Sequence, residues 1–98
     1  TVKRIGNHAF STCFYLRSIT IPNSVSYIQR GAFAGCFFLT SVNLTSFTSD
    51  NIPALENDWE DIFTESAIFE VASEDIAQAF INKENWPTDT DRYNWPGK

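Results

Sequence analysis

Residues 16–21 read LRSITI and residues 39–44 read LTSVNL, so the pattern L-x-x-[IV]-x-[IL] occurs twice in the chain. The register extends beyond these six positions, because aligning Val2 with Val25 also aligns Ile5 with Ile28. The same separation relates the other matched pairs, which are Ala9 with Ala32, Phe10 with Phe33, Cys13 with Cys36, Leu16 with Leu39, Ser18 with Ser41, Ile19 with Val42 and Ile21 with Leu44. A period held over so many apolar and small positions indicates an internal structural repeat.

Each repeat contains a short strand followed by a turn. Ile19 and Ile21 are apolar and alternate with polar residues, which predicts that both face the core, because successive side chains of a strand point to opposite sides. Ser18 and Thr20 should then face outward. Residues 22–24 (PNS) have the composition of a tight turn. We therefore expect coils stacked into a solenoid, in which equivalent residues form ladders through the core.

These repeats carry two longer motifs. Residues 2–10 read V-x-x-I-G-x-x-A-F, and residues 13–25 read C-x-x-L-x-S-I-x-I-P-N-S-V. Over residues 1–44 the chain resembles the 23-residue leucine-rich repeats of BspA-like bacterial surface proteins. The resemblance implies an α/β leucine-rich-repeat solenoid of short parallel strands in a secreted or cell-surface protein that mediates adhesion. The chain departs from the family where small polar residues usually follow the cysteine, because aromatic residues stand there.

Beyond residue 44 the period weakens. Residues 62–63 (IF) and 67–71 (AIFEV) predict a last, irregular coil that ends in an edge strand. We expect a helix over about 73–83, capped by Ser73 and packed through Ile76, Ala79 and Phe80. An amphipathic helix there would cover the end of the stack. We therefore predict two regular repeats in residues 1–48, and the irregular coil with its C-terminal cap in residues 49–98.

The two parts of the chain differ in charge. Residues 1–49 carry four bases and no acid, a net charge of +4, whereas residues 50–98 carry three bases and twelve acids, a net charge of −9. This asymmetry marks a boundary near Asp50. Four dispersed bases are too few for a nucleic-acid surface. No apolar run approaches the roughly 20 residues of a membrane-spanning helix, so we expect no membrane insertion.

Few residues suit catalysis or metal binding. We expect Cys13 and Cys36 to be free thiols in one ladder position rather than a disulfide. A metal site would need His8 as a third ligand beside the two cysteines, and no fourth ligand stands at a useful spacing. The repeats also contain no carboxylate that could orient His8, which argues against a catalytic triad. The acidic residues 56–61 (ENDWED) lack the glycine and ligand spacing of a calcium loop, so we interpret them as a solvated loop. We expect no cofactor and no enzymatic activity.

The candidate binding residues lie on the outward face of the strands and on the aromatic pairs beside them. The strand candidates are Arg17, Ser18, Thr20, Thr40, Ser41 and Asn43. The aromatic candidates are Phe14, Tyr15, Phe37 and Phe38, which should stack as a ridge and, if exposed, mark an interaction site for a protein or glycan. The alternatives are that neighbouring coils cover this ridge, and that the chain is a purely structural end of a longer array.

The aromatic residues of the tail also have two readings. Trp86, Tyr93 and Trp95 could tie the tail onto the core or offer a platform for sugar rings, and we favour the anchoring role. Residues 43–45 (NLT) match the acceptor pattern for N-glycosylation, a match that we interpret as accidental.

The N-terminal end of the stack is the last feature to place. The chain starts at Thr1, part-way through a repeat, so we expect a piece of a longer protein. The strand at 16–21 should have an unpaired edge, and Ile5, Phe10 and Ile19 should be open on one side. Exposed edges recruit partners, which predicts self-association through this end or stacking within a longer array.

Overall fold

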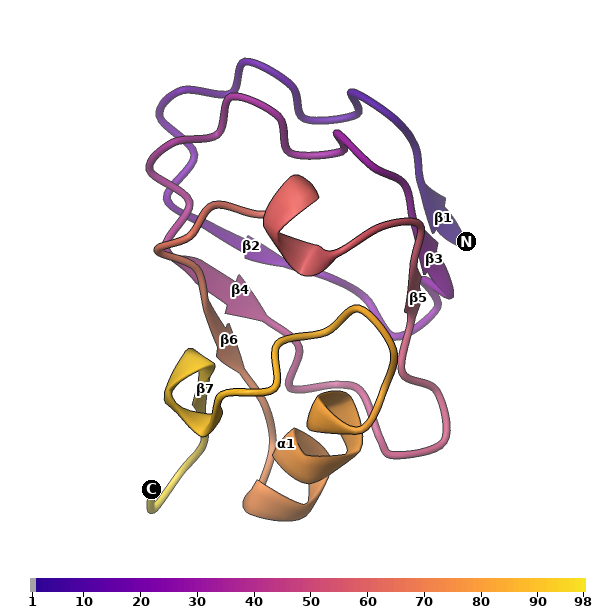
Figure 1. Cartoon of the computed structure of the whole chain (residues 1–98), viewed down its shortest axis with the longest axis vertical. Helices are drawn as coiled ribbons and strands as arrows, with labels where there is room; N and C mark the ends of the chain where they lie inside the picture. Colours follow the sequence, from indigo (N-terminus) through magenta and orange to yellow (C-terminus); the bar gives the residue numbers. More distant parts are fainter. Residues whose placement is uncertain (1) are drawn as a thin grey trace.

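In the computed structural model, which describes residues 2–98, the chain winds through three stacked coils, each contributing one strand to each of two parallel sheets (Figure 1). Thr1 lies outside the described residues, so the predicted start of the first coil is described from Val2 onward. The first sheet has the order β1 (Arg4–Ile5), β3 (Tyr27–Ile28), β5 (Ala54–Leu55). The second has the order β2 (Ser18–Thr20), β4 (Ser41–Asn43), β6 (Ile68–Glu70), β7 (Tyr93–Asn94).

Three short helices complete the structure. They are the 3-10 helix η1 (Trp59–Asp61), the α-helix α1 (Glu74–Ile81) and the 3-10 helix η2 (Thr90–Arg92). Parallel strands in two sheets with a single α-helix agree with the expected α/β repeat fold. The core fills the space between the two sheets.

The strand register follows the repeat read from the sequence. Ser18 pairs with Ser41 in the second sheet, and Arg4 pairs with Tyr27 in the first, so both pairs keep the repeat spacing. The next step, from Ser41 to Ile68, is longer, because more residues connect β4 to β6 than connect β2 to β4. The three coils therefore stack in register although the third is irregular.

One ladder of aromatic rings runs through the three coils. Phe33 stacks between Phe10 and Phe63, with ring centroids 5.1 Å apart on each side. The small alanine before Phe33 is fully buried, so the backbone can pass close to the ladder. Stacked rings of this kind add to the area that they bury.

The alternation predicted for the strands is present. Ile21, Val42 and Leu44 are fully buried, whereas Ser18 and Thr20 are exposed. Pro22 accepts a hydrogen bond from the Val25 amide at 3.0 Å, which closes the predicted turn. The two-residue strands of the first sheet were not predicted, because two residues are too few to show alternation.

Helix α1 differs in detail from the expectation. The Ser73 side chain accepts a hydrogen bond from the Ile76 amide at 3.4 Å, which caps the helix as predicted. The helix ends at Ile81 instead of near residue 83. The buried residues are Ala77 and Phe80, whereas Ile76 and Ala79 are only partly buried. Phe80 of the predicted face thus lies in the core and Ile76 packs against it, while Ala77, which was not predicted, is more deeply buried than Ala79.

The strand predicted at 67–71 is not an edge strand, which corrects that expectation. β7 pairs with β6 in parallel, Phe69 with Tyr93 and Glu70 with Asn94. The expectation that aromatic residues anchor the tail is confirmed for Trp86 and Tyr93, which are 3% and 1% exposed. The Trp86 indole donates to the Pro53 carbonyl at 2.8 Å, and the Tyr93 hydroxyl donates to the Pro87 carbonyl at 2.8 Å. Burial raises the pKa of the Tyr93 hydroxyl, which keeps it a donor.

Candidate interaction surface

Two equivalent turns place four aromatic side chains on the surface. In the first turn the Leu16 amide donates to the Cys13 carbonyl at 3.1 Å, and in the second the Leu39 amide donates to the Cys36 carbonyl at 3.2 Å. A turn closed in this way holds its first and last residues on the core and projects its two central residues outward. Those central residues are Phe14 with Tyr15 and Phe37 with Phe38.

A glycine is required beside these turns. The Thr12 amide donates to the Ala34 carbonyl at 2.8 Å, which brings the two coils together. Gly35 has a φ of +82°, and a Cβ on it would lie 3.2 Å from the Thr12 nitrogen. The backbone there adopts a left-handed conformation that favours glycine. Gly35 therefore lets the second turn stack closely on the first.

The four aromatic side chains, which we call the aromatic ridge, are all exposed. The exposed fractions are 48% for Phe14, 87% for Tyr15, 68% for Phe37 and 54% for Phe38. Phe14 and Phe37 stack with centroids 6.2 Å apart and planes 15° apart, as predicted. Tyr15 and Phe38 form no matching stack within residues 2–98, which corrects that part of the expectation. Most large apolar side chains of this chain are buried, so the ridge is an exception that packing does not explain.

The ridge is confined to two coils. More residues separate Phe33 from Phe63, its partner in the ring ladder, than separate Ser41 from Ile68, its partner in the sheet. The third coil therefore has fewer residues between ring and strand than the second. Its turn is closed by the Ala67 amide, which donates to the Thr64 carbonyl at 3.1 Å, but the two exposed central residues are the polar Glu65 and Ser66. The Thr64 hydroxyl also donates to the Leu39 carbonyl at 2.9 Å and joins the third coil to the second.

The predicted strand residues lie on β2 and β4 or directly before these strands, next to the ridge. Ser18 pairs with Ser41, and Thr20 pairs with Asn43. The Arg17 carbonyl accepts hydrogen bonds from the Thr40 and Ser41 amides, at 3.0 and 3.2 Å. Arg17, Ser18, Thr20 and Thr40 are exposed, and Ser41 and Asn43 are half-buried. The structure therefore brings all six together, with the ridge at the amino ends of β2 and β4.

A polar pocket lies at the opposite, carboxyl ends of the strands. It has a volume of about 340 Å³. Its lining residues are Asn43, Thr45, Glu70, Val71, Asn94, Trp95 and Pro96. Of these only Asn43 was predicted as a binding residue. The alternation in residues 67–71 could have identified Glu70 as outward-facing, but no sequence signal placed Asn94 and Trp95 beside it.

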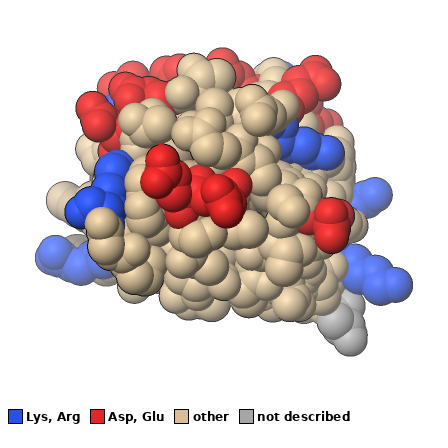
Figure 2. All heavy atoms as spheres, turned by 90° about the horizontal axis from the view of Figure 1, so that it is seen from below, with Lys and Arg blue, Asp and Glu red and all other residues tan. Residues whose placement is uncertain are grey.

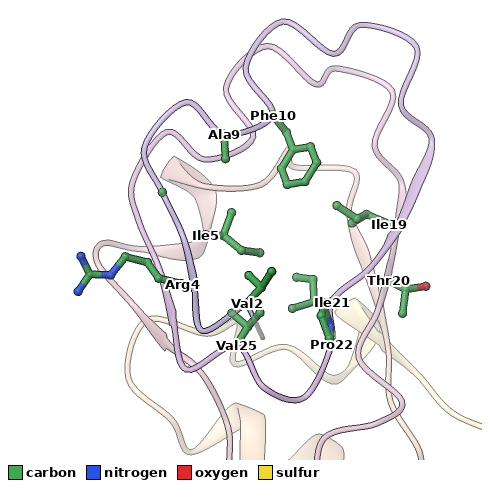
Figure 3. A pocket seen from close by; sticks show the side chains of 11 residues that line it. Val2, Arg4, Ile5, Ala9, Phe10, Ile19, Thr20, Ile21, Pro22 and Val25 are labelled. Carbon is green, nitrogen blue, oxygen red and sulfur yellow. The ribbon is translucent and has the colours of Figure 1, made fainter.

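The N-terminal end of the stack is open in the described residues. The strand pairings there are of β1 with β3 and of β2 with β4. A mostly apolar pocket of about 300 Å³ lies against this end, lined by Ile5, Phe10 and Ile19 among others (Figure 3). Phe10 and Ile19 are only partly buried, in contrast to their equivalents Phe33 and Val42. The open ladder agrees with the prediction for Phe10 and Ile19, whereas Ile5, although it lines the pocket, is buried at 7% exposure.

Comparison with known proteins identifies the family of this chain. The family model described as "BspA type Leucine rich repeat region (6 copies)" matches residues 1–83, which is most of the chain. The chain belongs to the BspA-type leucine-rich repeat family. No curated protein and no solved structure matches it. The match reaches past the two regular repeats to beyond the end of α1, so the irregular coil and the helix are covered by the same family model.

Leucine-rich repeats of the BspA type are generally non-enzymatic and generally mediate protein interactions. Within residues 2–98 of this BspA-type chain, no group of three or more His, Cys, Asp or Glu side chains could hold a metal ion. The described residues also contain no helix long and apolar enough to cross a membrane. The acidic residues 56–61 are part structured, since η1 forms there and a Glu56 carboxylate oxygen accepts from the Arg30 amide at 2.8 Å.

The two cysteines of the BspA-type repeats occupy unequal environments. Cys36 is fully buried, and its thiol donates to the Phe10 carbonyl at 2.8 Å. Burial raises the pKa of the Cys36 thiol. Cys13 is only partly buried, because it belongs to the first coil. Neither forms a disulfide in the structure.

Charge divides the surface of the molecule. Figure 2 views it from the end that carries α1, where acidic side chains lie along the upper part of the view and near its centre, and basic side chains project at its sides. The twelve acids all follow residue 49 in the sequence. The ridge and β2 belong to residues 1–49, in which every charged side chain is basic.

Proposed function

We propose that this chain is a non-catalytic protein-interaction module whose partner binds the aromatic ridge and the adjacent outward residues of β2 and β4. The observation that carries this proposal is the exposure of four aromatic side chains in one ridge. Aromatic residues are enriched at the centres of protein interfaces, where they supply much of the binding energy. The parent protein would be secreted or attached to the cell surface and would act in adhesion.

The chemistry of the ridge indicates the kind of partner. Exposed rings suit an apolar segment of a partner protein, and the rigid stack beneath them reduces the entropy lost on binding. Arg17 follows the first turn directly and is exposed. It carries a positive charge in a part of the chain without acids, so a partner with acidic residues beside its apolar segment fits best.

A selection experiment tests this proposal. A displayed library of random peptides is selected on the immobilised chain, and the enriched peptides are tested on variants. We expect apolar and acidic residues in the enriched peptides. A Tyr15→Ser/Phe37→Ser variant should lose binding by tenfold or more, whereas Lys83→Ala, which changes the cap away from the ridge, should keep it. Enriched peptides that bind the ridge variant as well as the original chain would refute the proposal.

A second function has its own supporting observation. The stack is covered by α1 and β7 at one end and presents an apolar pocket at the other, which fits a structural end of a longer array. In that case a second copy or further coils would cover Ile5, Phe10 and Ile19. Comparing peptide binding by this chain and by a longer parent protein separates the two functions, because a purely structural end would bind nothing by itself.

A further inference from the structure

We infer that the polar pocket at the carboxyl ends of β4, β6 and β7 is a carbohydrate subsite that takes an uncharged pyranose residue of a glycan. This inference deepens the proposed function, since it rests on the outward face of the second sheet being a binding surface. It concerns the opposite end of that face from the aromatic ridge, so the two can be tested apart.

The pocket is built on a row of side chains in register. Asn43 pairs with Glu70, and Glu70 pairs with Asn94, on three adjacent parallel strands. Adjacent strands lie about 4.8 Å apart, so the row spans roughly 10 Å. The hydroxyl groups of a pyranose ring and its neighbour are spread over a similar width. The sheet thus presents amide and carboxylate groups at intervals suited to a sugar.

Hydrogen bonds within the row fix these groups before any ligand binds. The Asn43 Oδ1 atom accepts from the Thr45 amide at 2.9 Å and from the Thr45 hydroxyl at 2.7 Å. The Asn43 NH₂ group is thereby oriented as a donor, and residues 2–98 supply it no acceptor. One Glu70 oxygen accepts from Asn94 Nδ2 at 3.4 Å, which leaves the other oxygen as an acceptor. Sugar hydroxyls both donate and accept, so the row can satisfy them in either sense.

Trp95 supplies the apolar surface that a sugar ring also needs. Unlike Trp86 and Tyr93, Trp95 is only partly buried, and its remaining surface lines the pocket. The Lys98 ammonium lies 4.7 Å from its ring centroid, and Lys98 also donates to the Thr90 carbonyl at 2.7 Å. These contacts hold the indole in place. A fixed indole presents an apolar surface against which the C–H groups of a sugar can pack.

The charge of the pocket selects the class of sugar. Glu70 is the one charged side chain among the pocket's lining residues, so the carboxylate of a uronic or sialic acid would be disfavoured beside it. A divalent cation is not favoured either, since Glu70 is the only acidic or sulfur-containing side chain that lines the pocket. A neutral hexose or N-acetylhexosamine fits both the hydrogen-bonding groups and the charge.

A glycan array followed by titration tests the inference. The 98-residue chain is applied to arrays of neutral and acidic glycans, and the methyl glycoside of the best neutral hit is titrated by NMR. We expect binding of neutral glycans, with shifts centred on Trp95, Glu70 and Asn43. Trp95→Ala should weaken binding about tenfold, which is the scale of one aromatic contact.

Controls keep the test decisive if Trp95→Ala perturbs the fold. Glu70→Gln keeps the size of a half-buried side chain and Asn94→Ala shortens an exposed one, and each should weaken binding severalfold, whereas the exposed change Glu74→Gln should not. Tyr15→Ser/Phe37→Ser should bind glycans normally, so loss of ridge binding does not affect this test. Failure of the chain to bind any neutral glycan, a preference for acidic glycans, or equal binding by Glu70→Gln, Asn94→Ala and the original chain would overturn the inference.

Discussion

The ring of Phe14 lies against the ring of Phe37 at a centroid distance of 6.2 Å, and about half or more of each side chain is exposed. The phenylalanines four residues earlier in each repeat, Phe10 and Phe33, are also stacked, but they form part of the core ladder. The same repeat therefore produces one ladder of rings that stabilises the fold and one that faces solvent.

This contrast gives a prediction about stability. Phe33→Ala should lower the free energy of unfolding by about 3–5 kcal/mol, because it removes a buried ring from the ladder. Phe37→Ala should lower it by about 1 kcal/mol or less, because its ring is largely exposed. Urea denaturation of both variants measures the difference. Similar losses for the two variants would mean that the ridge is part of the packing rather than a free surface.

A second prediction concerns the thiols. Titration under denaturing, non-reducing conditions should recover two thiols per chain, because Cys13 and Cys36 occupy the same ladder position in successive coils. In the native state Cys13 should react well before Cys36, since Cys36 is buried and burial raises its thiol pKa. Recovery of no thiols would show a disulfide, and equal native rates would contradict the described burial.

A third prediction concerns the cap. A chain truncated after Leu44 should aggregate, because β4 would lose its pairing with β6 and the core would lose Phe63 and Phe69. Size-exclusion chromatography and circular dichroism of the truncated chain measure this. A milder variant, Trp86→Ala, should stay soluble but lose about 3–5 kcal/mol of stability. A soluble, folded monomer from the truncated chain would show that the cap is dispensable.

The N-terminal end yields a fourth prediction. Sedimentation velocity at increasing concentration should show reversible self-association through the open end, because Phe10 and Ile19, which line the apolar pocket there, are only partly buried. An Ile19→Lys variant should stay monomeric, whereas the matched change Thr48→Lys, distant from that end, should associate normally. A monomer at all concentrations, with the first coil protected from hydrogen exchange, would show that this end needs no cover.

The regular coils could be predicted from sequence because equivalent residues such as Ile19 and Val42 recur at a fixed spacing and face the same core. The position of the ridge followed from the same spacing, since Phe37 lies between two buried residues of one turn. β7 could not be predicted, because a two-residue strand at Tyr93–Asn94 has no periodic pattern and pairs through its backbone. For the same reason the polar pocket could not be predicted, since Trp95 and Asn43 line one pocket only because β7 pairs with β6.

The location of the binding surface is the central claim, and amide hydrogen exchange with and without a library-selected peptide tests it most directly. We predict that the bound peptide slows exchange in residues 13–18 and 36–41, which carry the ridge and the amino ends of β2 and β4, and leaves α1 unchanged. Protection confined to α1 or to residues 2–10, with none in the two turns, would contradict the account.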